Sequence, residues 1–108
     1  MQSKENKNLI FIRLFPDEDI NEQLKKVCKL HNVKTAIVIS GIGQLKDARL
    51  GYFKKKSDYF PEYFNKPLEI VSLTGNLNKQ DDDYILHLHA VLCDEVFCLR
   101  KFFRFTAC

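Results

Sequence analysis

The sequence has no tryptophan, a single methionine, and few glycines (four) or prolines (three) among its 108 residues. It also lacks any apolar run close to the roughly 20 residues that a helix needs to span a bilayer. The N-terminal segment, MQSKENKN, is polar and has no apolar stretch of the kind found in secretory signal peptides. We therefore expect a cytoplasmic protein with no membrane partner, in which residues 1–8 form a disordered lead-in.

Cysteine pairs at metal-binding or redox spacing are absent as well. The four cysteines are Cys28, Cys93, Cys98 and Cys108, and no two of them form a CxxC motif. In a cytoplasmic protein such scattered cysteines are more typical of small core residues or free thiols than of a disulfide framework. We therefore expect free thiols.

An excess of positive charge is confined to the end of the chain. The net charge is +3, and residues 96–108 hold three basic side chains and no acid, so the rest of the chain carries 14 basic and 14 acidic side chains. DNA-binding domains usually cluster cations on one face. The only dense cluster before residue 96 is Lys54-Lys55-Lys56, a pattern more typical of a solvated loop. Charge therefore gives little support to DNA binding.

One helical pattern is followed by several strand patterns. Over residues 19–31 apolar positions recur at helical spacing, and Asp19 with Glu22 matches a capping box. Strands are predicted over 9–15, 35–40, 44–53, 68–77 and 84–93, with 35–40 buried on both faces, a loop or short hairpin over 54–67 and a charged turn over 78–83. This order indicates one α+β domain with a mainly antiparallel sheet.

Residues 84–93, YILHLHAVLC, carry the main chemical feature of the sequence. Successive side chains of a strand point to opposite faces, so His87 and His89 share one face and the leucines share the other. Residues two apart on a strand are separated by about 7 Å, and both imidazoles can bend towards one cation. The alternative is a pair of core or interface histidines with hydrogen-bond partners.

A zinc site at this pair needs a third protein ligand and a fourth position filled by protein or water. His31 near the end of the predicted helix, Cys98 and Cys108 have suitable chemistry, but nothing in the sequence places them beside the pair. The metal candidates are therefore His87 and His89 alone, and the candidate cofactor is a divalent metal such as zinc.

Four stretches, in order, give the chain a family resemblance: LIFIRLFPDEDINEQL, TAIVISGIGQLKDARLGYF, PLEIVSLTGNL and YILHLHAVLCDE. Together they cover about residues 9–95, and the sequence resembles the Plants-and-Prokaryotes Conserved (PPC) domain. The resemblance implies an α+β fold in which a strongly bent, mainly antiparallel sheet packs against one main helix, assembled as a homotrimer. Because the chain has no Arg-Gly-Arg-Pro segment of the plant AT-hook type, it is similar to the stand-alone prokaryotic form.

The resemblance also bears on function. Stand-alone members are labelled as DNA-binding and mostly have no established activity. Some members hold a metal on the His-x-His strand together with a third histidine, an arrangement similar to the zinc site of acetolactate decarboxylase. His87 and His89 occupy the first two of these positions, which makes a metal at the pair an implication of the resemblance.

The end of the chain departs from the family pattern. After Glu95 it reads VFCLRKFFRFTAC, without the Gly-Gly-His turn of the family and with no histidine after His89. We expect an incomplete domain over 9–95, with its last strands and third metal ligand missing, followed by a divergent tail over 96–108. One hypothesis is that residues from about 97 onward are an out-of-frame translation; the alternative is a genuine shortened form whose tail packs as a replacement strand.

Three functions follow. The first is a non-enzymatic, trimer-type module associated with DNA or partner proteins, with no catalytic residues. The second is a metal-dependent, zinc-type enzyme or metal-binding protein that uses His87 and His89 and is impaired by the lost ligand; Glu69 or Glu95 is a conceivable acid or base, but neither has a supporting motif. The third is a poorly folded product without a function of its own. We predict the first.

Overall fold

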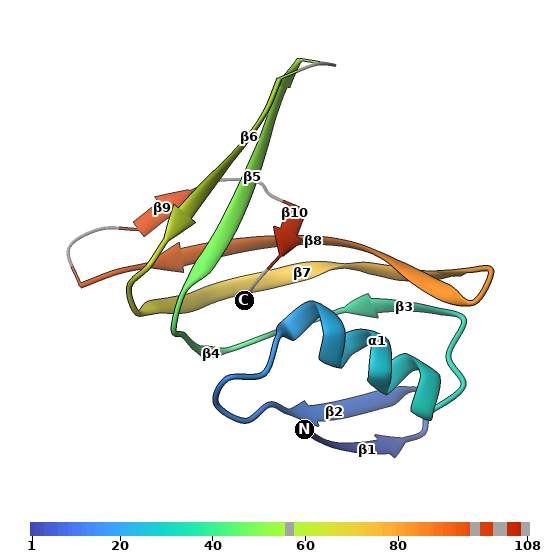
Figure 1. Cartoon of the computed structure of the whole chain (residues 1–108). Coiled ribbons are helices and arrows are strands. Elements are labelled where there is room, and N and C mark those ends of the chain that lie inside the picture. The colour runs from blue at the N-terminus through green and yellow to red at the C-terminus, as the bar shows by residue number, and fades with distance from the viewer. Residues whose placement is uncertain (56–57, 96–97, 101–103, 107–108) are drawn as a thin grey trace.

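The computed structural model describes residues 1–55, 58–95, 98–100 and 104–106, with side chains described over 1–51 and 62–95 (Figure 1). The chain opens with a two-stranded antiparallel hairpin, β1 (Gln2–Asn6) and β2 (Leu9–Arg13), and continues into the helix α1 (Ile20–Leu30). Within the described residues, no helix has the length and apolarity needed to cross a membrane.

The β1–β2 hairpin corrects the expectation of a disordered lead-in over residues 1–8. Gln2 pairs with Arg13 and Asn6 with Leu9 along a continuous antiparallel ladder. Four of the five β1 residues are exposed, so this strand buries little apolar surface and its ladder hydrogen bonds come from the backbone. A hydrophobic pattern cannot reveal a strand of this kind.

The helix confirms its predicted position and cap. The Asp19 carboxylate accepts a hydrogen bond from the Glu22 backbone N–H at 2.9 Å, which satisfies one of the unpaired donors of the first turn. Its apolar stripe is buried and consists of Ile20, Leu24, Val27 and Cys28. The helix ends at His31, whose backbone N–H donates to the Val27 carbonyl at 3.0 Å.

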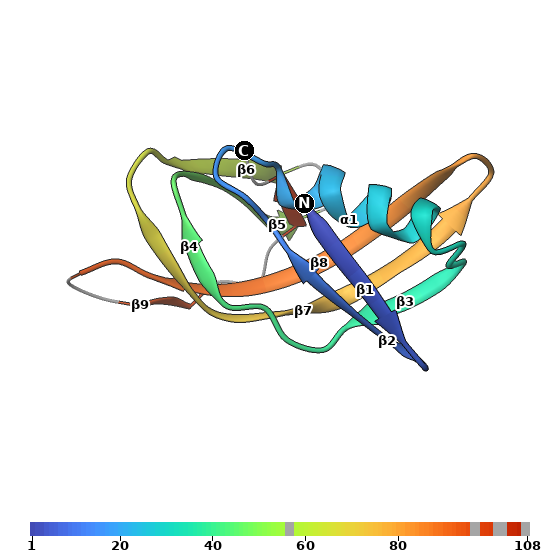
Figure 2. The same ribbon diagram turned by 90° about the horizontal axis from the view of Figure 1, so that it is seen from below.

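A five-stranded antiparallel sheet is built on two long strands, β7 (Leu68–Gln80) and β8 (Asp83–Cys93). The strands β3 (Thr35–Val38) and β4 (Gly43–Leu45) pair with different parts of β7, and β9 (Cys98–Arg100) pairs with β8. Figure 2 shows the β7–β8 ribbon curving from the region of α1 at one end to β9 at the other. The predicted α+β class with a bent, mainly antiparallel sheet is therefore confirmed.

A three-stranded sheet with the order β10-β5-β6 packs against the first sheet through β10 and β5. It contains β5 (Ala48–Lys55), β6 (Asp58–Phe64) and β10 (Arg104–Thr106), so the segment predicted as a loop or short hairpin over 54–67 supplies all of β6. The C-terminal segment adds β9 to β8 and β10 to β5. The divergent tail over 96–108 therefore contributes one short strand to each of these two sheets.

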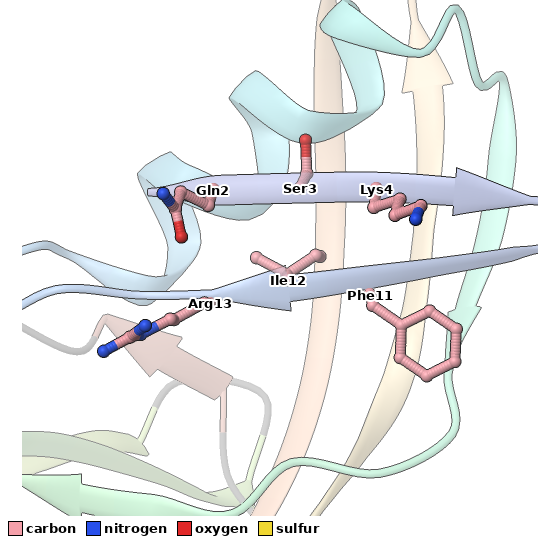
Figure 3. Close-up of a pocket in the computed structure, with 6 residues that line it drawn as sticks. All are labelled: Gln2, Ser3, Lys4, Phe11, Ile12 and Arg13. Carbon is pink, nitrogen blue, oxygen red and sulfur yellow. The ribbon is translucent and has the colours of Figure 1, made fainter.

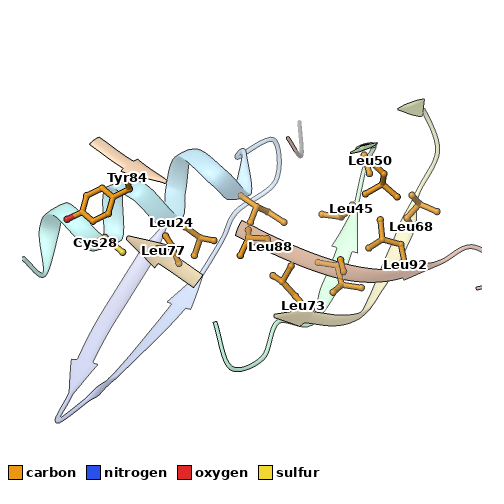
Figure 4. Close-up of a cluster of buried hydrophobic side chains, with 14 residues drawn as sticks. Leu24, Cys28, Leu45, Leu50, Leu68, Leu73, Leu77, Tyr84, Leu88 and Leu92 are labelled. Atoms are coloured by element: carbon orange, nitrogen blue, oxygen red, sulfur yellow. The ribbon is translucent and has the colours of Figure 1, made fainter. Parts of the chain in front are cut away.

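The core lies along one face of the β7–β8 ribbon. Figure 4 shows Leu24, Leu77, Cys28 and Tyr84 grouped beside α1, and Leu45, Leu50, Leu68 and Leu92 grouped where β4 and β5 meet β7 and β8. The Tyr84 hydroxyl donates to the Val33 carbonyl at 2.5 Å, and burial raises the pKa of the Tyr84 phenol. This hydrogen bond ties the start of β8 to the segment that leads into β3.

The opposite face of the five-stranded sheet is open, which corrects the prediction that 35–40 is buried on both faces. Ala36 and Val38 are half-buried, whereas Ile37 is 71% exposed and Ile39 is 66% exposed. The described residues of α1 and β5 pack on the inner face. The continuous apolar run therefore reflects one buried face and one apolar face that is exposed in the single chain.

Candidate metal centre

The predicted alternation along β8 is confirmed. Tyr84, Leu88, Ala90 and Leu92 are buried on the core side of the strand. On the other side Ile85 is 48% exposed, His87 is exposed and His89 is half-buried. The two histidines are therefore accessible on the open face of the sheet and are not part of the core.

The two imidazoles face each other. The His87 Nε2 and His89 Nε2 atoms are 3.2 Å apart, and the ring centroids are 5.1 Å apart with planes tilted by 47°. For these nitrogens to share a hydrogen bond, one must carry its proton on Nε2 while the other accepts there. The strand therefore brings two imidazole nitrogens close together, on the shared face that the alternation in the sequence predicts.

The separation of the nitrogens fits a metal ion. Two imidazole nitrogens on a tetrahedral zinc ion, each at a bond length of 2.0–2.1 Å, are about 3.3–3.4 Å apart. The observed 3.2 Å is close to this value. The pair can thus act as two adjacent ligands without a change in the path of β8.

Polar side chains of β7 flank the histidines on the same face. Thr74 is the Cα partner of His89, Asn76 of His87 and Asn78 of Ile85. The Asn78 amide N–H donates to Asn76 Oδ1 at 3.3 Å, and the Thr35 hydroxyl donates to Asn78 Oδ1 at 3.2 Å. A hydrogen-bonded row from β3 to β7 therefore ends beside the histidine strand.

Gly75 lets β7 approach the histidine strand closely. Its φ of +153° is rare for residues with a side chain, and a Cβ atom there would overlap the His87 carbonyl oxygen and lie 2.8 Å from Leu88 Cα. Glycine inside a strand is typical of such close backbone approach. The sequence predicts that Gly75 lies within a strand. It does not show that Gly75 faces the backbone of His87 and Leu88.

Of the other residues with suitable ligand chemistry, His31 lies away from the pair. His31 caps the end of α1 and contacts β1, with Nε2 2.8 Å from Ser3 Oγ and Nδ1 3.4 Å from Glu5 Oε2. The side chains of Cys98 and Cys108 fall outside the described residues. Over the described part of the chain, no three histidine, cysteine, aspartate or glutamate side chains gather in a way that could hold a metal ion.

The two glutamates considered as acid or base are not partners of the histidines in the sheet. Glu69 is the Cα partner of Cys93, four residues beyond His89, and Glu95 follows the end of β8. Sheet register therefore gives neither carboxylate a position opposite an imidazole.

The expectation of free thiols holds for Cys28 but not for Cys93. Cys28 is buried and free, and burial raises the pKa of its thiol. Cys93 is disulfide-bonded, and the spacing of the cysteines in the sequence did not show this.

A separate hollow of about 300 Å³ lies on the N-terminal hairpin and is lined by Gln2, Ser3, Lys4, Phe11, Ile12 and Arg13 (Figure 3). Phe11 and Arg13 point to the same side of β2 in this view. The hollow contains neither His87 nor His89, so it is not part of the candidate centre.

Comparison with known proteins places this fold in a family. The model of the Plants and Prokaryotes Conserved (PCC) domain matches residues 1–98. The chain belongs to the PCC domain family. The match includes β1, which the resemblance over 9–95 left out, and the histidine strand.

Solved structures share the PCC fold. A putative DNA-binding protein of Bacteroides thetaiotaomicron is 24% identical, with a TM-score of 0.85 over 96% of this chain and 73% of that one. A metal-containing protein of Archaeoglobus fulgidus is 26% identical, with a TM-score of 0.77 over 90% and 69%. A plant- and prokaryote-conserved (PPC) protein of Pyrococcus horikoshii is 30% identical, with a TM-score of 0.72 over 83% and 64%.

A curated relative is much longer than this PCC domain. The bifunctional protein GlmU of a Synechococcus strain is 28% identical over 83 residues, which are 77% of this chain and 12% of that protein. The chain therefore spans about an eighth of the length of this relative.

Proposed function

We propose that this PCC domain binds one divalent metal ion, such as zinc, through His87 and His89. The observation that carries the proposal is the 3.2 Å separation of the two Nε2 atoms on the open face of β8. The Archaeoglobus protein, 26% identical, is named as metal-containing, which supports the same assignment here.

The role of the chain is to hold the ion at an accessible surface. When bound, an ion with open coordination positions can polarise a carbonyl or activate a water molecule. The Cα partners of His87 and His89 on β7 are Asn76 and Thr74, neither of which titrates as an acid or base near neutral pH. We therefore propose a metal-binding module and not an enzyme.

The test is metal binding by the full chain. We expect elemental analysis to find one metal ion per chain, and zinc to raise the melting temperature, because a ligand that binds only the folded state stabilises it. His87→Ala and His89→Ala should each abolish both effects. His31→Ala, a histidine substitution at the far end of α1, should leave zinc binding unchanged. Purified protein without bound metal and with the same melting temperature in zinc would refute the proposal.

A second candidate function is self-assembly, and the open sheet face favours it. Ile37, Ile39 and Ile42 are 71%, 66% and 87% exposed in the single chain. Exposed apolar patches commonly mark protein contacts, so we infer that copies of the domain assemble through this face. The PPC resemblance implies that the assembly is a homotrimer. Light scattering coupled to size-exclusion chromatography should give three times the chain mass, and a monomer at high concentration would contradict it.

Association with DNA or with partner proteins stays a prediction of the resemblance. Among the described side chains, α1 presents Lys25, Lys26 and Lys29, and Lys25 is paired with Asp83 at 3.5 Å. Lys54 to Lys56 fall outside the described side chains. If the domain binds duplex DNA through several phosphate contacts, its affinity should fall steeply as salt rises; binding that hardly changes with salt would exclude this mode.

A further inference from the structure

We propose that Asn76 supplies the third protein ligand of the metal centre, through its side-chain oxygen Oδ1. This inference rests on the proposed function of the His87–His89 pair. It assigns to β7 the position that the missing histidine would otherwise fill.

Sheet register puts Asn76 beside the pair. Asn76 is the Cα partner of His87, and both side chains are exposed, while their neighbours Leu77 and Leu88 are buried on the other face. Directly opposed residues of an antiparallel pair have Cβ atoms about 4.5–5.5 Å apart. The Asn76 amide and the His87 imidazole therefore project from neighbouring points of one surface.

The chemistry of the amide suits the role. Asn76 Oδ1 has two lone pairs, and the Asn78 N–H uses one of them. Asparagine side-chain oxygens ligate hard divalent cations such as Ca²⁺, and imidazole nitrogens suit zinc and its transition-metal neighbours. Two nitrogens and one oxygen leave the fourth position of a tetrahedral ion for water or another ligand.

The hydrogen-bonded row from β3 would hold the ligand in place. The Thr35 hydroxyl donates to Asn78 Oδ1, and the Asn78 amide N–H donates to Asn76 Oδ1. Asn78 therefore orients the Asn76 amide. Groups that orient metal ligands in this way commonly affect metal affinity by about 10–100-fold. No such row is needed to support the core, since all three side chains are exposed.

The experiment compares zinc affinities of full-length variants by isothermal titration calorimetry. Asn76→Ala should weaken zinc binding by about 10-fold or more, and Asn76→Asp should strengthen it, because a carboxylate is a better zinc ligand. Thr74→Val, at the equivalent position opposite His89, is the matched control and should leave the affinity unchanged. The visible spectrum of bound Co²⁺ should change in Asn76→Ala and stay the same in Thr74→Val. Thermal melting without metal checks that each variant folds.

The outcomes separate this inference from the function on which it rests. Wild-type protein that binds no zinc overturns both. Zinc binding that is lost in His87→Ala but unchanged in Asn76→Ala overturns only the role of Asn76. An Asn76→Asp variant that binds more weakly than wild type also overturns it, because this would assign Asn76 a hydrogen-bonding role without a bond to the metal. Equal losses in Asn76→Ala and Thr74→Val overturn it too.

Discussion

At the scale of single residues, the candidate centre depends on one glycine as well as on the two histidines. His87 and His89 supply nitrogen atoms 3.2 Å apart. Gly75 lies across from the backbone between them and leaves no room for a Cβ atom. The position of the imidazoles therefore depends on a residue that has no side chain to interact with them.

Gly75→Ala should destabilise the domain and weaken zinc binding. The added methyl group overlaps the His87 carbonyl, so β7 and β8 must move apart, at a cost of about 1–3 kcal/mol in the free energy of unfolding. Urea denaturation measures this cost. Gly43→Ala is the control: its φ is also positive, at +138°, but no atom lies within 4 Å of the added Cβ, so it reports backbone strain alone. Equal costs at the two positions would contradict the predicted clash.

Asp83 should make the stability of the domain sensitive to acid. The Tyr84 backbone N–H donates to its carboxylate at 2.8 Å and, with the nearby Lys25, lowers the pKa of Asp83. A lowered pKa means that the unfolded chain binds more protons, so this stabilisation is present above the unfolded pKa, near 3.9, and is lost as pH falls through the folded value. Asp83→Asn should therefore flatten the loss of stability below about pH 4.

Urea denaturation at a series of pH values measures this effect. The exposed neighbour Asp82 provides the matched control, since Asp82→Asn removes a charge from the same turn without removing the hydrogen bond to Tyr84. An Asp83→Asn variant with the same pH profile as wild type would show that the Asp83 carboxylate does not contribute.

At the scale of elements, the parts with a strong periodic pattern are those that the sequence predicted. The helix and its Asp19 cap, and the two faces of β8, follow from apolar positions at spacings of 3.6 and 2. The strand β1 escaped prediction because it is polar, and the open face of β3 escaped because an apolar run does not tell whether a second layer covers it. Burial against other elements is a tertiary property.

The candidate metal ligands also divide into residues that local spacing predicts and a residue that only the sheet register places. Alternation along one strand was enough to place His87 and His89 together. Asn76 could not be placed beside them, because the predicted turn over 78–83 is longer than the observed turn at Asp81 and Asp82. Since Gln80 pairs with Asp83, every partner up to His89 follows from this short turn. The third ligand that we propose depends on a register that the sequence pattern did not reveal.

The cap of α1 provides a prediction at this scale. Asp19→Ala removes the acceptor for the Glu22 N–H and should lower the free energy of unfolding by about 1 kcal/mol. Chemical denaturation followed by circular dichroism measures the change. Asp19→Ser, which keeps a capping oxygen, should recover most of the loss, and an equally unstable serine variant would contradict the capping role.

At the scale of the whole molecule, the helix α1 and the β10-β5-β6 sheet pack against one face of the β7–β8 ribbon. The other face carries both the histidine pair and exposed isoleucines. If this face joins copies of the domain, as proposed, the metal centre lies at or beside the contact between them. Assembly and metal binding should then influence each other, because both use one surface.

Ile37→Lys should therefore prevent assembly. A charged side chain at this position, 71% exposed in the single chain, would have to be desolvated in the contact. Leu30→Lys is the matched control, since Leu30 is 69% exposed but lies at the end of α1. Light scattering should show a lower mass only for Ile37→Lys. A shift for both variants, or for neither, would argue against the isoleucine face as the contact.

The alternation of β8 has a practical consequence for work with this protein. Were β8 to slip by one residue against β7, the imidazoles would turn inward and the leucines outward, because neighbouring side chains occupy opposite faces. A chain with this misaligned strand would therefore neither bind the ion nor form the native core. On the proposed function, the zinc content of a preparation thus measures the fraction of molecules with native strand pairing, and it can serve as a simple assay of folding quality.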